Sequence, residues 1–442
     1  MSLIVGEPDH CDVLIIGGGP AGSTAAALIA DRGRDVLLLE KAAHPRFHIG
    51  ESLLPRNLPI LDRLGLHREV AAMGVLKPGA EFVSDETGQS VAYDFALSAD
   101  GEYTHSYQVR RAEFDHALLM NARRKGARIA ERTAVTAVAL GRRGGRAQVT
   151  AIDHHGTVHS FAPRLILDAS GRDAFLAGKL QLKRSNRRNS TAAVYAHFRN
   201  VKLRTGATAG YITVHLIKDG WCWMIPLPGG IMSVGLVGGH ALFKHREVNL
   251  QEFFLDRLHS SPTVNARMPE AELASGIMTA ANYSYSAKRA SGEGFFIIGD
   301  AFAFVDPVFS SGVLLAMTAG EMAAEVAETW LKDFRAGRAL ARRAERRLRS
   351  SMKRLSWLIY RINHPVFREM FMAPSDIFRM RSGIVGLLAG NLQGGWRYSG
   401  PLLAFKSVFY AKSLVWRLGR SPAPPISSAA GQPRGDGHVT ID

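Results

Sequence analysis

The chain has 442 residues, of which 46% are hydrophobic, and a net charge of +16; this is enough apolar sequence for one large or two ordinary cores. It has only two cysteines and no apolar run of about 18 residues, which argues against a disulfide framework, a metal site and a membrane-spanning helix. Its first ten residues lack the basic and apolar segments of a signal peptide, so we expect a cytoplasmic protein.

The N-terminal segment predicts a strand, a glycine turn, a helix and a second strand. An alanine-rich helical stretch separates two buried apolar runs, VLIIG and VLLLE. Gly17, Gly19 and Gly22 form G-x-G-x-x-G after the first run, which permits a tight turn, close approach of a pyrophosphate and helix packing. The helix N-terminus attracts phosphates, and Glu40 at the end of the second run can bind a ribose. Together these features predict a dinucleotide-binding site.

The middle of the chain alternates between predicted sheet and helix. Stretches at about 77–107 and 190–290 are rich in β-branched and aromatic residues with Gly and Pro between them, which indicates sheet. Helical spacing is found over 58–73 and 312–331. We therefore predict an α/β fold in which residues 1–330 form a discontinuous, Rossmann-like cofactor domain. A mixed or antiparallel sheet inserted into it would cover the reactive end of the cofactor.

The last part of the chain is strongly basic. Residues 331–420 carry 19 Lys or Arg against four Asp or Glu, and the pattern is helical with breaks expected at Pro365, Pro374 and Pro401. Such a localised charge suggests an acidic partner or an anionic surface, although solvated helix faces explain it at least as well. The tail at 421–442, rich in Pro, Gly and Ser, is expected to be disordered.

Two later segments indicate which dinucleotide is bound. VRRAEFD at 109–115 precedes a predicted helix, and a Gly-Asp pair at 299–300 ends a predicted strand shortly before an Asp-Pro pair. With these segments, the chain resembles the flavin monooxygenase superfamily over residues 11–320. The resemblance implies FAD, with Asp300 on the ribityl chain, Arg111 on the nucleotide, and Val135 and Pro307 also in the cofactor site. Asp300 taken alone is also compatible with a helix N-cap before Ala301.

No second glycine motif lies between a strand and a helix, so nothing indicates a nicotinamide site. We therefore expect reduced FAD to come from a separate flavin reductase.

Three segments are similar to the flavin-dependent halogenases of secondary metabolism. They are FHIGESLLP at 47–55, GWCWMIP at 220–226 and DPVFSSGV at 306–313. In that family, reduced FAD and O₂ give a C4a-hydroperoxide, which a halide attacks to form hypohalous acid. The resemblance implies that chloride or bromide rests on the backbone N–H groups of Ser311 and Gly312. It also implies that Trp221 and Trp223 separate flavin from substrate, although core packing explains these two residues about equally well.

The family also has a lysine beyond the flavin, which positions hypohalous acid or forms a haloamine. Lys77, in KPGAEF, fits its K-x-G-A-x-F pattern, and a solvated surface lysine is the ordinary alternative. Tryptophan halogenases have a glutamate where this chain has Phe309, so free tryptophan is not the expected substrate. The pattern resembles the branch that halogenates phenols, pyrroles or carrier-bound substrates, and an acidic carrier protein would suit the basic C-terminal region.

Two other functions stay open. The first is a reductase of the geranylgeranyl type: such reductases share the N-terminal fold and the D-A-S-G segment at 168–171, and for one of them the basic tail could rest on an anionic membrane. The second is an aromatic hydroxylase of the same superfamily. The W-x-W-x-I-P segment and Lys77 favour a halogenase over both. A non-enzymatic scaffold is disfavoured because the motif residues are intact. A nucleic-acid partner is not expected.

Overall fold

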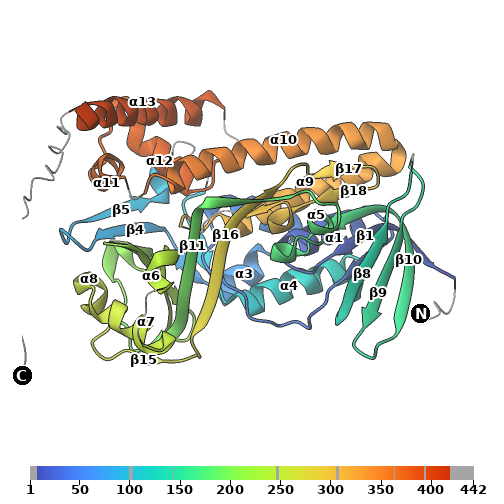
Figure 1. The fold of residues 1–442 in the computed structure, drawn as a ribbon, viewed down its shortest axis with the longest axis horizontal. Helices are drawn as coiled ribbons and strands as arrows, with labels where there is room; N and C mark the ends of the chain where they lie inside the picture. The colour runs from blue at the N-terminus through green and yellow to red at the C-terminus, as the bar shows by residue number, and fades with distance from the viewer. Residues whose placement is uncertain are drawn as a thin grey trace, which may run out of the picture.

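The computed structural model of the protein describes residues 7–98, 103–142, 144–244, 248–304, 308–362, 364–392 and 395–418 (Figure 1). The side chains of residues 185–190, 240–241, 281–283 and 396–397 are not described. The prediction for the tail at 421–442 therefore lies outside the described residues.

The first sheet has a parallel centre, in the order β18-β10-β1-β2-β7. The parallel strands are β1 (Asp9–Ile16), β2 (Val36–Leu39), β7 (Arg128–Ala130), β10 (Val158–Asp168) and β18 (Phe295–Ile297). Antiparallel strands β8 (Thr133–Ala139), β9 (Gln148–Asp153) and β17 (Ser291–Gly292) extend it. The VLLL run of β2 is buried throughout, as expected for a parallel strand covered on both faces.

Three helices pack together against this sheet. They are α1 (Pro20–Ala30), α4 (Arg111–Arg124) and α9 (Gly312–Lys332). Every residue of α1 is buried, and its small side chains allow α9 to approach closely: a Cβ added at Gly320 would lie only 2.6 Å from the Ala21 carbonyl oxygen. The glycine turn before α1 is thereby fixed relative to the sheet.

The second sheet is antiparallel except for one parallel pair, β4 with β12. Its strands are β4 (Gly79–Ser84), β5 (Ser90–Asp94), β11 (Lys183–Arg199), β12 (Ile212–Ile217), β13 (Gly220–Leu227), β14 (Ile231–Gly239), β15 (Glu272–Leu273), β16 (Met278–Ala287) and β19 (Ala303–Phe304). Figure 1 shows the long strands β11 and β16 side by side across the middle of the molecule. A separate pair joins β3 (Val75–Lys77) to β6 (Ser106–Gln108).

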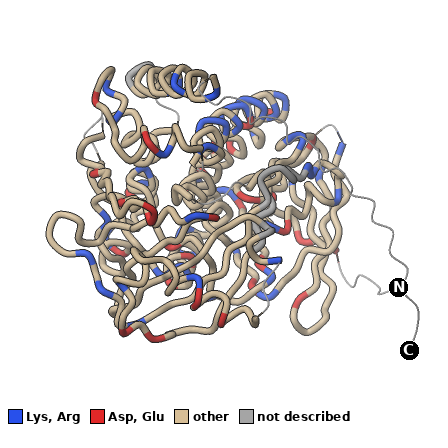
Figure 2. The backbone as a smooth tube through the Cα atoms, turned by 60° about the vertical axis from the view of Figure 1, so that its left-hand side comes forward, with Lys and Arg blue, Asp and Glu red and all other residues tan. Residues whose placement is uncertain are grey.

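The remaining helices lie mostly at the periphery. They are α2 (Leu58–Leu64), α3 (His67–Met73), α5 (Phe175–Lys179), α6 (His240–Lys244), α7 (Leu250–His259), α8 (Pro262–Asn265), α10 (Phe334–Ile359), α11 (Pro365–Met372), α12 (Met380–Leu388) and α13 (Trp396–Leu418). The helices α10 to α13 form one side of the molecule (Figure 1). In Figure 2, Lys and Arg residues mark much of the length of α10.

The predicted α/β class is confirmed, and three details differ from the sequence expectation. Helices α6 to α8 interrupt the stretch expected to be sheet; Asn249 caps α7 and Ser261 caps α8 through side-chain hydrogen bonds. The helix expected over 58–73 is two helices, because Gly65 adopts a left-handed conformation (φ +74°) that ends α2. Pro401 lies inside α13 instead of breaking it, packed where Gly383 of α12 leaves room.

The first sheet draws its strands from three separate stretches of chain, between which the second sheet and its helices are inserted. We propose that the first sheet forms the cofactor unit of residues 1–330 and that the second sheet covers it. Helices α10 to α13 then make up the C-terminal region.

Candidate functional site

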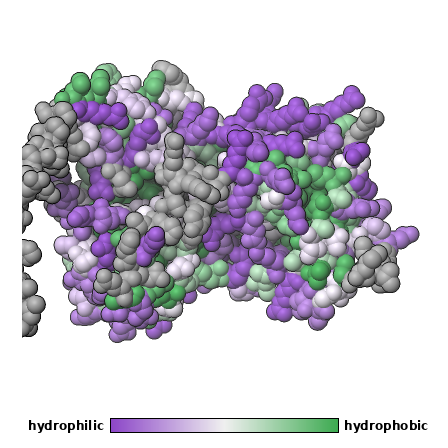
Figure 3. Space-filling model, in the orientation of Figure 1, coloured by the Kyte–Doolittle hydropathy of each residue, from purple (hydrophilic) through white to green (hydrophobic). Residues whose placement is uncertain are grey.

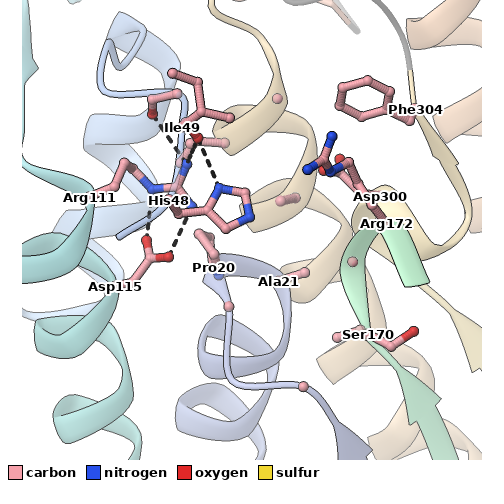
Figure 4. Close-up of a pocket in the computed structure, with 18 of the residues that line it drawn as sticks. Pro20, Ala21, His48, Ile49, Arg111, Asp115, Ser170, Arg172, Asp300 and Phe304 are labelled. Carbon is pink, nitrogen blue, oxygen red and sulfur yellow. Dashed lines mark hydrogen bonds and ion pairs between the residues drawn. The ribbon is translucent and has the colours of Figure 1, made fainter. Parts of the chain in front are cut away.

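A pocket of about 450 Å³ lies between the two sheets. One side is formed by the ends of β1, β2 and β10, and the other by side chains of β11, β12, β13 and β16. Ligands of α/β folds bind at the carboxyl ends of parallel strands, which is where this pocket begins. Figure 4 shows His48 and Arg111 on one side of it and Asp300 and Arg172 on the other.

The three motif glycines have different surroundings. A Cβ at Gly22 would overlap the carbonyl oxygen of Gly17, and Gly17 itself has φ +105° and lies against the Ala169 carbonyl. These two positions therefore need glycine for the fold. Gly19, the N-cap of α1, has no protein atom within 4 Å of an added Cβ, and it lines the pocket. The turn thus leaves open space in front of an electropositive helix end, as a pyrophosphate requires.

Glu40 is buried at the end of β2 and also lines the pocket. Its Oε2 accepts a hydrogen bond of 2.7 Å from the Gly18 backbone N–H, and its Oε1 accepts one of 2.8 Å from Ala42. The carboxylate is therefore held in place and retains lone pairs for a ribose hydroxyl. Val135 of β8 lines the same pocket.

Arg111 also holds neighbouring parts of the chain together, which the sequence did not indicate. Its Nε and Nη2 donate to the two carboxylate oxygens of Asp115 at 2.8 and 2.9 Å, and its Nη1 donates to the Ile49 carbonyl at 2.6 Å (Figure 4). The guanidinium lines the pocket while fixing the loop that carries the 47–55 motif.

Asp300 lies at the opposite side, in the 3₁₀ turn η5 (Gly299–Ala301). Its pKa is raised to about 6 by burial, and the cations of Arg111 and Arg172 oppose that rise. The N-cap of η5 is Ile298, so the alternative explanation of Asp300 as a helix cap is wrong.

The two tryptophans of β13 share one face and line the pocket, with ring centroids 5.8 Å apart. Both are buried, and Trp223 Nε1 donates to Ser233 Oγ at 3.1 Å. The ring of Trp223 also occupies the space beside Gly235 that a Cβ would fill. These contacts fix the indoles as a rigid wall of the pocket.

The predicted halide loop is described only in part, because Asp306 and Pro307 lie outside the described residues. Ser310 has φ +56° and lines the pocket together with Gly312, the first residue of α9. Ser311 is buried as the N-cap of α9 but does not line the pocket. Gly312 thus presents a helix N-terminus to the pocket, which favours an anion.

Lys77 is 1% exposed, so it is not a solvated surface lysine. Its Nζ donates to Ser52 Oγ and to the Leu53 carbonyl oxygen, both at 2.8 Å, and lies 5.4 Å from the centre of the Phe95 ring. Burial lowers its pKa to about 7. Lys77 does not line the pocket, but Ser52 does. Lys77 therefore lies behind the pocket wall and is hydrogen-bonded to Ser52, which forms part of that wall.

The sequence interpretation assigned no role to Glu51, Ser52 or His197. Glu51 is buried in the pocket wall, with Oε1 2.8 Å from His197 Nε2, while its Oε2 has no hydrogen-bond partner. Glu51 and Ser52 belong to the 47–55 motif, so the sequence contained a pattern that could have marked them as site residues. His197 comes from β11, 146 residues further along the chain, and no local pattern marks it.

Among the described residues, no group of three or more His, Cys, Asp or Glu could hold a metal ion. Within the same residues, no helix is long and apolar enough to cross a membrane.

Comparisons with known proteins agree with this geometry. A family model described as an FAD binding domain matches residues 10–340. The tryptophan 2-halogenase of Chondromyces crocatus is 35% identical over 72% of this chain and 61% of its own length. The 1H-pyrrole-2-carbonyl-(peptidyl-carrier protein) chlorinase of Pseudomonas fluorescens is 29% identical over 88% of this chain and 91% of its own.

Among solved structures, the myxobacterial chondrochloren halogenase CndH superposes with a TM-score of 0.74 at 30% identity, covering 89% of this chain and 96% of that one. By contrast, the chain spans less than two thirds of the length of the first curated relatives, 61% in the case of the tryptophan 2-halogenase.

Proposed function

The chain belongs to the flavin-dependent halogenases, a family with an FAD-binding domain, and from this premise we propose that it halogenates an electron-rich carbon with chloride or bromide. The observation that carries the proposal is Lys77, a fully buried lysine with a lowered pKa, one hydrogen bond behind a pocket that two tryptophans line. Together with the W-x-W-x-I-P segment, Lys77 favours a halogenase over a reductase or hydroxylase of the same superfamily.

The residues present fit FAD. Open space in front of Gly19 can take the pyrophosphate, and Glu40 can bind a ribose. Asp300 would bind the ribityl chain and Arg111 the nucleotide. We propose these four residues, with Gly17, Gly22 and Val135, as the cofactor site, and we add Pro307 from the sequence alone. When bound in reduced form, FAD supplies with O₂ the oxidising power that a halide needs.

The chain's own residues then control where the oxidised halide goes. Backbone N–H groups of Ser311 and Gly312, at the start of α9, would hold the halide by the helix N-terminus. Trp221 and Trp223 keep the substrate off the cofactor, so that hydroxylation is suppressed. Lys77 receives hypohalous acid, by hydrogen bond or as a haloamine, and presents it to the substrate in a fixed orientation.

A separate flavin reductase is expected to supply the electrons. The purified protein should oxidise NADH or NADPH negligibly, because neither sequence nor pocket offers a second dinucleotide motif among the described residues. Anaerobic stopped-flow absorbance of bound FAD tests this. Rapid stoichiometric reduction by either nicotinamide would contradict it, whereas reduced FAD added from a reductase should support turnover.

We propose a phenol, a pyrrole or a carrier-tethered substrate. One relative is named as a chlorinase of a pyrrole on a peptidyl-carrier protein and another as a tryptophan 2-halogenase. The chain covers more of the first relative, and Phe309, where tryptophan halogenases place a glutamate, disfavours free tryptophan. Mass spectrometry of products from free and carrier-loaded phenols and pyrroles, with free tryptophan as comparison, tests this choice.

The basic face of α10 is the proposed docking surface for an acidic carrier. Arg342, Arg343, Arg346 and Arg347 are exposed there, whereas Ala341, Ala344 and Leu348 on the other face are buried. Changing the four arginines to Glu should lower kcat/KM for a carrier-loaded substrate about tenfold and leave free substrate unaffected, because like charges repel across the contact. The wild-type rate on carrier-loaded substrate should also fall with salt.

A matched variant reverses four exposed cations elsewhere: Lys179, Arg199, Lys202 and Lys218. It should behave as wild type on both substrates. Equal rates for the α10 variant and wild type on carrier-loaded substrate would identify these arginines as an ordinary solvated face.

A further inference from the structure

Helix α13 presents an apolar ridge to the outside of the molecule. Its members share the outer side of the helix and high exposure: Leu403, Tyr410, Ala411, Leu414, Val415 and Leu418. Val415 and Leu418 are 70% and 76% exposed. Figure 3 shows hydrophobic side chains gathered over α13, in contrast to the hydrophilic surface along α10. We call these six residues the α13 ridge.

The inner side of α13 is apolar as well. Leu402, Phe405 and Phe409 are buried there, and the helix packs on α11 and α12. A helix that is apolar on both sides is expected inside a protein core or at a membrane. α13 instead lies at the outer edge of the molecule (Figure 1). In the turn η6 (Ile377–Arg379), which packs near α13, Ile377 and Phe378 are also exposed, by 63% and 73%.

The charged residues of α13 itself are all basic. The sequence of α13 contains Arg397, Lys406, Lys412 and Arg417 and has no Asp or Glu. On the neighbouring α11, Glu369 is paired with Lys412 at 2.9 Å. An apolar stripe flanked by Lys and Arg is the arrangement of helices that lie in the interface of anionic bilayers.

We infer that the α13 ridge rests on an anionic lipid surface, a partner beyond the proposed halogenation and independent of it. A second copy of the chain is a poorer occupant, because two α13 helices would bring their cations face to face. A bilayer offers acyl chains to the ridge and phosphate groups to the exposed cations Lys412 and Arg417, whereas the ammonium of Lys406 lies 4.8 Å from the centre of the Trp357 ring. Tyr410, whose hydroxyl accepts hydrogen bonds from Trp357 and Arg361, stands at the boundary where such rings are favoured.

Sedimentation with vesicles tests the inference on the full chain. Wild-type protein should sediment with mixed phosphatidylcholine and phosphatidylglycerol vesicles, and less with phosphatidylcholine alone. Leu414→Glu combined with Val415→Glu should weaken binding to the mixed vesicles about tenfold or more, since two side chains that would enter the lipid become charged. Because both residues are exposed, the variant should keep the wild-type melting temperature.

Leu203→Glu serves as the matched control: Leu203 is 56% exposed but comes from the loop between β11 and β12, so this variant should bind as wild type does. Absence of wild-type binding to the mixed vesicles would overturn the inference. Equal vesicle binding by the double variant would also overturn it, because the vesicles would then be bound by other basic surfaces of the protein. Light scattering without lipid gives the last check: a dimer that the double variant dissociates would identify a second copy as the occupant and overturn the lipid assignment.

Discussion

Replacing Lys77 by alanine should reduce carbon halogenation roughly a hundredfold or more while leaving FAD affinity and O₂ consumption near wild type. The reason is the position of the side chain. Lys77 does not line the pocket but is hydrogen-bonded to Ser52, which does, so in the proposed mechanism neither cofactor binding nor halide oxidation needs its amine. Without the amine, hypohalous acid is no longer oriented towards the substrate. Oxygen uptake and halogenated product, measured side by side, check the prediction.

Two further observations sharpen this test. Lys77→Arg should not restore activity, because a guanidinium stays protonated and cannot form a haloamine. If the amine is the nucleophile, wild-type halogenation should rise with pH through about 7, since only the neutral form reacts and burial lowers the pKa of Lys77 to about 7. Near-normal halogenation by a folded Lys77→Ala protein would remove Lys77 from the mechanism.

Gly19→Val should weaken FAD binding about a hundredfold or more without unfolding the protein. A Cβ added at Gly19 meets no protein atom within 4 Å, and Gly19 lines the pocket, so we expect valine there to occupy the space proposed for the pyrophosphate. Gly19 has φ −74° and an extended backbone, which valine tolerates. Fluorescence titration with FAD and circular dichroism measure the two properties separately.

Other glycines of the chain provide the controls. A Cβ added at Gly178, in α5, also has no neighbouring atom within 4 Å, and Gly178 lies outside the pocket, so Gly178→Val should change neither fold nor affinity. Gly22→Val should instead destabilise the fold, because its Cβ would overlap the Gly17 carbonyl. A folded Gly19→Val protein with wild-type FAD affinity would show that the pyrophosphate binds elsewhere.

The sequence predicted well those features that depend on residues close together in the chain. The glycine turn, the buried strands beside it and the shared face of Trp221 and Trp223 follow from local spacing, and the structure has all of them. The resemblance to flavin-dependent halogenases, which rested on such motifs, is confirmed by the comparisons.

Contacts between distant parts of the chain could not be predicted in this way. The hydrogen bond from Lys77 to Ser52 joins β3 to the 47–55 loop across 25 residues of chain. The contact of Glu51 with His197 depends on how the second sheet lies over that loop. Helices α6 to α8 were missed because composition averaged over 190–290 hides short helical stretches between strands. Pro401 is accommodated in α13 only because Gly383 of α12 gives it space.

The measurement that tests the central claim most directly is the mass of the product. Wild-type protein would be supplied with a flavin reductase, NADH, FAD, O₂ and a candidate phenol or pyrrole, free or carrier-loaded. The account predicts a product that carries chlorine in chloride buffer or bromine in bromide buffer, depends on O₂ and reductase, and is lost with Lys77→Ala. A product that gains oxygen or hydrogen instead, with the same mass in either halide, would identify a hydroxylase or a reductase and contradict the account.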